Sequence, residues 1–325
     1  MDLHIIGPLA TPAERAAVDA VLGPAESGWR GGPRDSGSDG HATHGGHAAR
    51  SRRDLLIPAL HAVQARIGWI SQPALNYVSR RLTVPPADAW GVATFYALFA
   101  TAPRPPVVAH VCDDLACRLA GSDELCADLE RTMGAEGEPG PDGERTWLRS
   151  PCLGLCDQAP AAMITTAGTE PDTIVAAPVD MAGIAARIGP GVQGWTSYGD
   201  PPIPQAGQPG LRLLARIGVV EPTSLDDYRA NGGFQALARA RAIGSRRIID
   251  EVTAANLVGR GGAAFPTGRK WAAVADQPAR PHYLVCNADE SEPGTFKDRV
   301  LMEGDPFAVV EAMAIEAFAV GAEKA

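Results

Sequence analysis

The chain has 325 residues, of which 45% are apolar and 21% charged, an ordinary composition for a globular protein with room for two domains. The formal net charge of −9 argues against nucleic acid as the main partner, because phosphate binding needs clustered Lys and Arg. The sequence has no long apolar run and no secretion signal in its first ten residues, so we expect a cytoplasmic protein without direct membrane insertion.

Residues 1–50 are expected to form a disordered leader. The stretch from Gly28 to Arg50 is rich in Gly, Ser, Asp and His, and it has too few apolar residues to offset the entropy lost on ordering. It also contains His41, His44 and His47, which we interpret as solvated side chains rather than as metal ligands.

Residues 51–190 are expected to form one unit that begins with three helices. The first helix has an apolar stripe with a spacing of three or four residues, at Leu56, Leu60, Val63 and Ile67. Ser71 is the predicted N-cap of the second helix, which Pro85 and Pro86 end. The third helix carries aromatic side chains that we assign to core packing, at Trp90, Phe95 and Phe99.

Short β-branched or apolar segments then predict strands at 107–111, 146–148 and 162–165. A helix that contains Leu125 and Leu129 follows the first strand, and a helix over 179–188 closes the unit. Four cysteines lie on loops at the ends of these strands: Cys112, Cys117, Cys152 and Cys156.

These four cysteines form a C-x4-C pair and a C-x3-C pair, separated by 34 residues. Thiolates stabilise soft metals, so the spacing favours an iron–sulfur cluster over a disulfide. Zinc remains an alternative, as do unrelated buried thiols, because the spacing only borders on that of zinc sites. Cys126 and Cys286 lie in apolar segments and are expected to serve only in packing.

Three motifs together resemble the thioredoxin-like [2Fe–2S] subunit of respiratory complex I and of related NAD-linked formate dehydrogenases and hydrogenases. They are the segment AWGVATFY from Ala89 to Tyr96, the C-x4-C pair, and the segment CLGLCDQAP from Cys152 to Pro160. The resemblance implies one [2Fe–2S] cluster, held by the four cysteines of the two pairs.

Residues 191–210 are rich in Pro and Gly and predict an exposed linker. Beyond it, Ser224 and Ser245 are predicted N-caps of two helices. The glycine-rich loop GRGGAAFPTGRKW begins at Gly259, and a helix over 267–275 follows it. Closely spaced glycines let backbone N–H groups approach a phosphate or a flat ring, but 248–257 reads as helix, which argues against a Rossmann dinucleotide motif.

A strand over 283–286 is expected to end in the acidic segment from Asn287 to Arg299. Its carboxylates could belong to a solvated loop, or they could bind a ligand together with the basic glycine loop. Both segments resemble the FMN- and NADH-binding subunit of the same enzymes, and LDDYRANGGF from Leu225 resembles an initial helix of that subunit.

The resemblance implies cofactor-binding roles for eight residues: Gly259, Gly261, Gly262, Phe265, Lys270, Asn287, Asp289 and Glu290. It further implies that Glu290 and Glu292 lie at the catalytic centre and that Phe265 and Glu292 face the nicotinamide dinucleotide. The family usually has Gly where this chain has Ala264. It also continues beyond the segment that ends at Ala325, so residues 211–325 are expected to be only the N-terminal part of the domain.

The expected fold class is therefore α/β. A helical N-terminal bundle and a thioredoxin-like [2Fe–2S] ferredoxin domain are followed by a partial α/β flavin-binding domain. The implied function is an electron-transfer module of an NADH dehydrogenase (diaphorase), with [2Fe–2S], FMN and NAD(H) as cofactors and other subunits of an NAD-linked assembly as partners. The alternative is a non-enzymatic [2Fe–2S] carrier or docking subunit whose flavin domain is incomplete.

Overall fold

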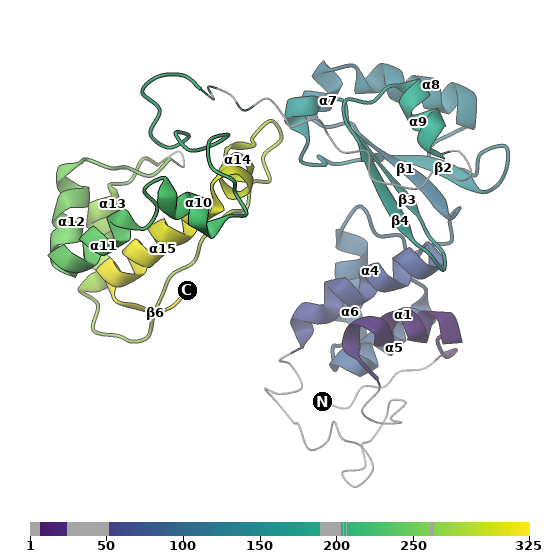
Figure 1. The fold of residues 1–325 in the computed structure, drawn as a ribbon. Helices are drawn as coiled ribbons and strands as arrows, with labels where there is room; N and C mark the ends of the chain where they lie inside the picture. The colour runs from purple at the N-terminus through teal and green to yellow at the C-terminus, as the bar shows by residue number, and fades with distance from the viewer. Residues whose placement is uncertain (1–6, 25–51, 189–202, 204, 206, 261–262) are drawn as a thin grey trace, which may run out of the picture. The chain divides into compact units, whose positions relative to one another are not determined.

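The computed structural model describes residues 7–24, 52–188, 203, 205, 207–260 and 263–325. It divides into two compact units, Met1–Pro201 and Pro202–Ala325, and the boundary lies inside the predicted linker (Figure 1). The residues outside the described part of the chain include His41, His44 and His47 of the leader, most of the linker, and Gly261 and Gly262.

The first unit combines helices with a four-stranded sheet. Its helices are α1 (Pro12–Leu22), α4 (Leu56–Ile67), α5 (Gln72–Leu82), α6 (Pro86–Phe95), α7 (Leu115–Leu119), α8 (Ser122–Met133) and α9 (Met181–Ile188), with 3-10 turns at Arg53–Leu55 and Cys156–Gln158. Its strands are β1 (Val107–Cys112), β2 (Arg145–Ser150), β3 (Ala162–Thr166) and β4 (Asp172–Ala176). The predicted helices at 56–67 and after Ser71 are confirmed, and the Ser71 hydroxyl accepts from the Ala74 N–H.

Helix α1 corrects the expectation that the whole leader is disordered. It has a complete capping box, because the Thr11 hydroxyl accepts from the Glu14 N–H while the Glu14 carboxylate accepts from the Thr11 N–H. Val18 and Leu22 are buried with residues of α4 and α5 in one apolar core. Composition alone does not predict this short amphipathic helix, because the low-complexity stretch that follows it dominates the composition of the leader.

Helix α6 also differs from expectation. Ala89 and Ala93 are its buried residues, whereas 48% of Trp90 and 79% of Phe95 is exposed. Of the aromatic residues assigned to core packing, only Phe99 packs against the core of the helical segment. The helix is apolar on all sides, so periodicity alone cannot identify its buried face.

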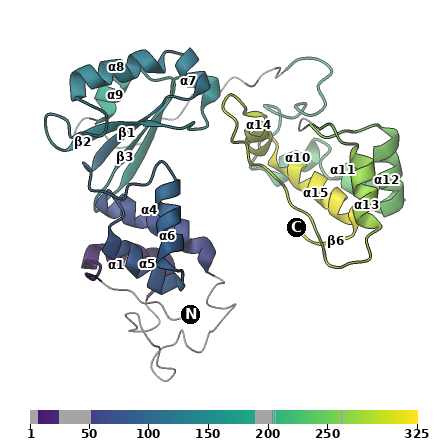
Figure 2. The same ribbon diagram turned by 180° about the vertical axis from the view of Figure 1, so that it is seen from behind.

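The sheet has the order β2-β1-β3-β4, with β1 parallel to β2 and antiparallel to β3. Helices α8 and α9 pack on one face, as the two views agree (Figures 1 and 2). Leu129 and Ile184 meet Ala109 and Ile164 in that layer. Cys126 is fully buried in the same layer, which confirms its packing role.

The second unit is mostly helical. It contains α10 (Leu225–Ala230), α11 (Gln235–Ile243), α12 (Ser245–Ala254), α13 (Thr267–Ala275), α14 (Lys297–Gly304) and α15 (Pro306–Val320), with the short parallel strands β5 (His282–Tyr283) and β6 (Ala322–Lys324). Helix α15 packs against α11, α12 and α13 (Figure 1). In the described part of the chain, no helix is both long and apolar enough to cross a bilayer.

Three expectations for this unit need correction. Ser245 makes no side-chain cap and is instead the first residue of α12, after Gly244. The strand expected over 283–286 is shortened to His282–Tyr283, because only a short segment pairs with β6. Cys286 is exposed rather than packed in a core.

The carboxylate of Glu311 on α15 connects that helix to α10 and to the start of α11. It is buried, and it accepts hydrogen bonds from the Tyr228 hydroxyl and from the N–H groups of Phe234 and Leu237. Burial by itself would raise the pKa of Glu311, but these hydrogen bonds outweigh burial and hold the pKa below its ordinary value. The ionised carboxylate therefore stabilises the folded unit above about pH 4.5, and this contribution is lost as the pH falls through the lowered pKa.

We predict that Glu311→Gln destabilises the second unit by about 2–4 kcal/mol at neutral pH, because an amide cannot accept all three hydrogen bonds. Hydrogen exchange at the amides of Phe234 and Leu237 should accelerate, and the loss of stability between about pH 5 and 3 should become shallower. Glu303→Gln, which alters a solvent-exposed glutamate on α14, is the control and should behave like the parent chain. Unchanged exchange in Glu311→Gln would contradict this role.

Candidate functional site

The pairing of β1 with β2 brings the two cysteine pairs to one edge of the sheet. Cys112 is the last residue of β1 and lies opposite Ser150, the last residue of β2. Cys117 lies on α7, directly after β1, and Cys152 and Cys156 lie in the segment that follows β2. Because the two strands are parallel, their carboxyl ends point the same way, so thiols far apart in sequence become neighbours.

The sulfur atoms are close within each pair. The Sγ atoms of Cys152 and Cys156 are 3.2 Å apart, and the Gly154 N–H donates to Cys152 Sγ at 3.4 Å. Gly154 has a φ of 78°, a left-handed conformation that lets the chain turn between the two cysteines. In the other pair, the thiol of Cys117 hydrogen-bonds that of Cys112.

The thiol pKa values reflect burial first and the neighbouring thiols second. Burial, followed by the hydrogen bond with Cys112, raises the pKa of Cys117 to about 12, and the charge of Cys156 adds to this shift. Burial likewise raises the pKa of Cys152 to about 11, with further contributions from Cys156 and Cys112. A bound cation that stabilises thiolates would have to offset this mutual repulsion.

The surroundings of the thiols suit a soft metal centre. Cys112 and Cys117 are only 1% and 2% exposed and form an apolar cluster with Ala161. Partly buried apolar residues pack around this cluster: Leu153, Leu155, Ala159 and Ala177. All four cysteines are free thiols, so the donor set is sulfur only, which matches an iron–sulfur centre better than a hard cation.

No group of three or more His, Cys, Asp or Glu side chains is positioned to hold a metal ion in the residues that the structure describes. The thiols instead approach one another as two pairs, each held on its own loop.

The cysteine pattern identifies these thiols but does not reveal the charged side chains beside them. Asp113 directly follows Cys112, and Arg118 directly follows Cys117; this adjacency is the available signal in the sequence.

In the second unit, two backbone hydrogen bonds join the residues before the glycine-rich loop to the residues after it. The Gly259 N–H donates to the Phe265 carbonyl at 2.9 Å, and the Thr267 N–H donates to the Leu257 carbonyl at 2.9 Å. A helix, α12, precedes the loop, which confirms the expectation that no strand leads into it. Ala264 has a φ of 47°, a left-handed conformation that is easier for the glycine usual in the resembling family.

Gly268 fixes the start of α13 against α12. A Cβ atom at this position would lie 2.1 Å from Thr253 Oγ1 and 2.8 Å from Thr253 Cα. Only glycine allows so close an approach of the two helices, and the loop that joins them depends on it. Helix α13 spans the residues predicted for it, Thr267–Ala275.

The residues predicted to bind the cofactor in the second unit are mostly exposed. Phe265 and Lys270 face solvent beside the glycine loop, and Asn287, Asp289 and Glu292 are exposed on the acidic segment. The Asn287 side-chain oxygen accepts from the Asp289 N–H at 3.0 Å.

Glu290 is less exposed than these residues, and its carboxylate has hydrogen-bond and ion-pair partners at the start of α14. It accepts from the N–H groups of Asp298 and Arg299 at 2.8 and 3.0 Å, at the start of α14, and it lies 3.4 Å from Lys297 Nζ. Burial opposes ionisation, but these hydrogen bonds and the ammonium group lower the pKa of Glu290. Glu290 is therefore ionised at neutral pH and holds the acidic segment against α14.

Two family models match this chain. Residues 43–175 match the thioredoxin-like [2Fe–2S] ferredoxin family, and residues 252–325 match the Nuo51 FMN-binding domain. The chain is a fusion of segments from these two families. The first match includes all four converging cysteines, and the second includes the glycine loop and the acidic segment.

One relative matches most of the chain, and another matches about a third of it. The alpha subunit of the NAD-reducing hydrogenase HoxS from Cupriavidus necator is 31% identical over 289 residues, which cover 85% of this chain and 45% of that protein. One NADH-quinone oxidoreductase subunit from Aquifex aeolicus is 48% identical over 113 residues, which cover 35% of this chain and 26% of that protein. The chain thus spans less than half the length of these relatives.

One solved structure has a fold similar to that of this chain. The NAD+-reducing [NiFe]-hydrogenase in its H2-reduced state is similar with a TM-score of 0.58 and 28% sequence identity. The similarity covers 83% of this chain and 44% of the hydrogenase chain. The α/β fold with a thioredoxin-like domain, expected from the sequence, is confirmed by this likeness and by the family match.

We predict that Gly268→Ala destabilises the packing of α13 on α12 by about 1–3 kcal/mol, because the added methyl group overlaps Thr253. Hydrogen exchange at the amides of α12 and α13 should accelerate. Gly91→Ala is a matched control, since a Cβ there meets no atom within 4 Å and should stabilise α6 slightly. If the two variants exchange alike, Gly268 is not the contact that positions the loop.

Proposed function

We propose that the chain is an electron-transfer module of an NAD-linked oxidoreductase, in which four cysteines hold a [2Fe–2S] cluster and the second unit binds FMN and NAD(H). The observation that carries this proposal is the placement of two pairs of free thiols at the carboxyl ends of the paired strands β1 and β2, in a chain that also contains an FMN-binding family segment. When bound, FMN would exchange a hydride with NAD(H) and single electrons with the iron–sulfur centre.

In the first unit, Cys112, Cys117, Cys152 and Cys156 would be the cluster ligands. The apolar residues around them would keep water from the buried pair and lower the local dielectric constant. The Gly154 N–H, which donates to Cys152 Sγ, would stabilise the more negative reduced state and so raise the reduction potential.

In the second unit, the glycine loop and the acidic segment would bind the flavin. Backbone N–H groups of the loop, which includes Gly259, Gly261 and Gly262, would approach the ligand, with Gly261 and Gly262 outside the described residues. Lys270 would supply positive charge, and Asn287 and Asp289 would offer polar groups to the ring or ribose. Phe265 and Glu292 would face the dinucleotide, and Glu290 would act mainly by holding the acidic segment in place.

The relatives are subunits of larger enzymes, so we propose that this chain also acts with other subunits of an NAD-linked dehydrogenase or complex I-like assembly. Free cysteines throughout the described part of the chain favour a reducing, cytoplasmic location. The direction of electron flow would depend on the partner subunits.

A second candidate function is a [2Fe–2S] electron carrier or docking subunit without flavin chemistry. The exposure of Phe265, Lys270 and Asn287 favours this alternative, since these side chains are open to solvent rather than enclosed. Zinc bound by the four thiols is a third possibility that metal analysis separates from both.

We predict that the purified chain contains about two iron atoms and equal inorganic sulfide, and that replacing any one of the four ligand cysteines with serine removes most of both. Cys286→Ser is the matched control, because Cys286 is exposed and distant in sequence from the site, and it should keep the iron. Zinc without iron, or iron that survives the ligand substitutions, would contradict the cluster assignment.

We predict that NADH bleaches a flavin absorbance band in the anaerobic chain loaded with FMN, and that a reduced iron–sulfur signal then develops by electron paramagnetic resonance. Lys270→Ala should weaken FMN binding roughly ten-fold while leaving the iron content unchanged, since the two sites lie in different units. A chain that holds the cluster but does not bind FMN supports the carrier function instead.

A further inference from the structure

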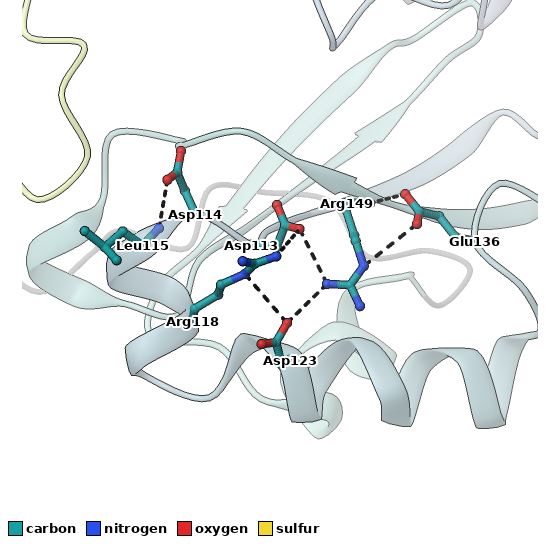
Figure 3. A network of polar contacts seen from close by, with 7 residues as sticks. All are labelled: Asp113, Asp114, Leu115, Arg118, Asp123, Glu136 and Arg149. Carbon is teal, nitrogen blue, oxygen red and sulfur yellow. Dashed lines mark hydrogen bonds and ion pairs between the residues drawn. The ribbon is translucent and has the colours of Figure 1, made fainter.

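Four charged side chains form a closed ring beside the cysteine loops (Figure 3). The ring alternates in sign, and its members are Asp113, Arg118, Asp123 and Arg149. Arg118 lies 3.7 Å from Asp113 and 3.8 Å from Asp123, measured between nitrogen and carboxylate oxygen atoms. Arg149 lies 3.5 Å from the same Asp113 oxygen and 3.3 Å from the same Asp123 oxygen, so each carboxylate has two cationic partners.

The members of the ring come from the elements that carry both cysteine pairs. Asp113 directly follows Cys112, and Arg118 directly follows Cys117. Arg149 lies on β2, three residues before Cys152. Asp123 is in the first turn of α8, where the helix dipole favours a negative charge. The ring thus joins the loop after β1 to the end of β2 through side chains as well as through the sheet.

Arg149 is the member with the most partners. Glu136 accepts from the Arg149 backbone N–H at 2.8 Å, and its carboxylate also lies 3.8 Å from the Arg149 guanidinium. The guanidinium therefore contacts three carboxylates, two from the first cysteine loop and α8 and one from the segment before β2 (Figure 3). A lysine could not span these partners, since its ammonium is a single point charge.

Two members of the ring, Arg149 and Asp113, are less exposed than Arg118 and Asp123, whose side chains are 57% and 60% exposed. The side chains of Arg149 and Asp113 are 35% and 24% exposed, so water screens them only in part. A single exposed pair contributes little to stability, but charges that share partners in a network couple to one another. On α8, the pair between Arg131 and Asp128 is more exposed, and neither residue is adjacent in sequence to a ligand cysteine, which makes it a natural comparison.

We propose that Arg149 is a positioning residue for the metal centre, which sets the separation of the Cys112–Cys117 pair from the Cys152–Cys156 pair by linking Asp113 and Asp123 to β2. This inference rests on the proposed [2Fe–2S] function and adds a residue outside the ligand set. It predicts that Arg149 governs how tightly the two loops close on the cluster, because loss of the guanidinium leaves Arg118 as the single bridge between the two aspartates.

The test compares Arg149→Gln, Arg149→Lys and the control Arg131→Gln in the full chain. Iron loss to an added chelator should be about five-fold faster in Arg149→Gln, because two to three weak contacts are lost together. The reduction potential should become more negative as one positive charge is removed, and the paramagnetic g values of the reduced chain should shift. Arg149→Lys should restore the potential but only part of the iron retention, and Arg131→Gln should match the parent chain.

Asp123→Asn tests the contact between Arg149 and Asp123 by removing the charge of the carboxylate. Because Asp123 is largely exposed, this variant replaces Arg149→Gln if Arg149→Gln does not fold. If Arg149 acts through Asp123, the variant with both Arg149→Gln and Asp123→Asn should lose iron more slowly than the combined effects of the two single substitutions predict. Faster iron loss with unchanged potential and g values would overturn the positioning role, as would full retention in Arg149→Gln. A parent chain without iron and sulfide would instead overturn the proposed function itself.

Discussion

The parallel pairing of β1 with β2 is the constraint on which the candidate metal centre depends. Register places Cys112 opposite Ser150, so the loops after both strands leave the sheet at the same edge. The two cysteine pairs therefore lie at neighbouring strand ends, although 34 residues separate them in sequence. Core packing of α8 and α9 on the sheet keeps this edge fixed, and the charged ring around Arg149 adds a second link between the same two loops.

The two units use different devices to position their candidate ligand segments. In the first, a sheet edge and an apolar cluster hold the thiols. In the second, the close approach of Gly268 to Thr253 fixes the helix after the glycine loop, and Glu290 ties the acidic segment to the start of α14. The thiols lie as two pairs at neighbouring strand ends, whereas most of the flavin-segment residues are exposed. The metal centre is consequently the better supported part of the proposed function.

The sequence predicted those features that depend on local patterns. Spacing identified the four cysteines, Ser71 identified the start of α5, and a glycine loop after a helix was recognised as unlike a Rossmann motif. Other features depend on tertiary contacts. Helix α1 was not predicted, and its place in the fold follows from the capping box of Thr11 and Glu14 and from the packing of Val18 in the apolar core. Phe95 and Cys286 lie in apolar segments but are exposed, which periodicity cannot reveal. The contacts of Arg149 likewise require the fold.

The central claim is that sulfur atoms from two distant loops enclose a pair of irons. Anomalous X-ray scattering from crystals of the anaerobic protein, recorded on both sides of the iron absorption edge, tests it most directly. The account predicts two adjacent iron peaks, bound by Cys112 and Cys117 on one side and by Cys152 and Cys156 on the other. A single peak that persists at the zinc edge, or no metal peak between these thiols, would contradict it.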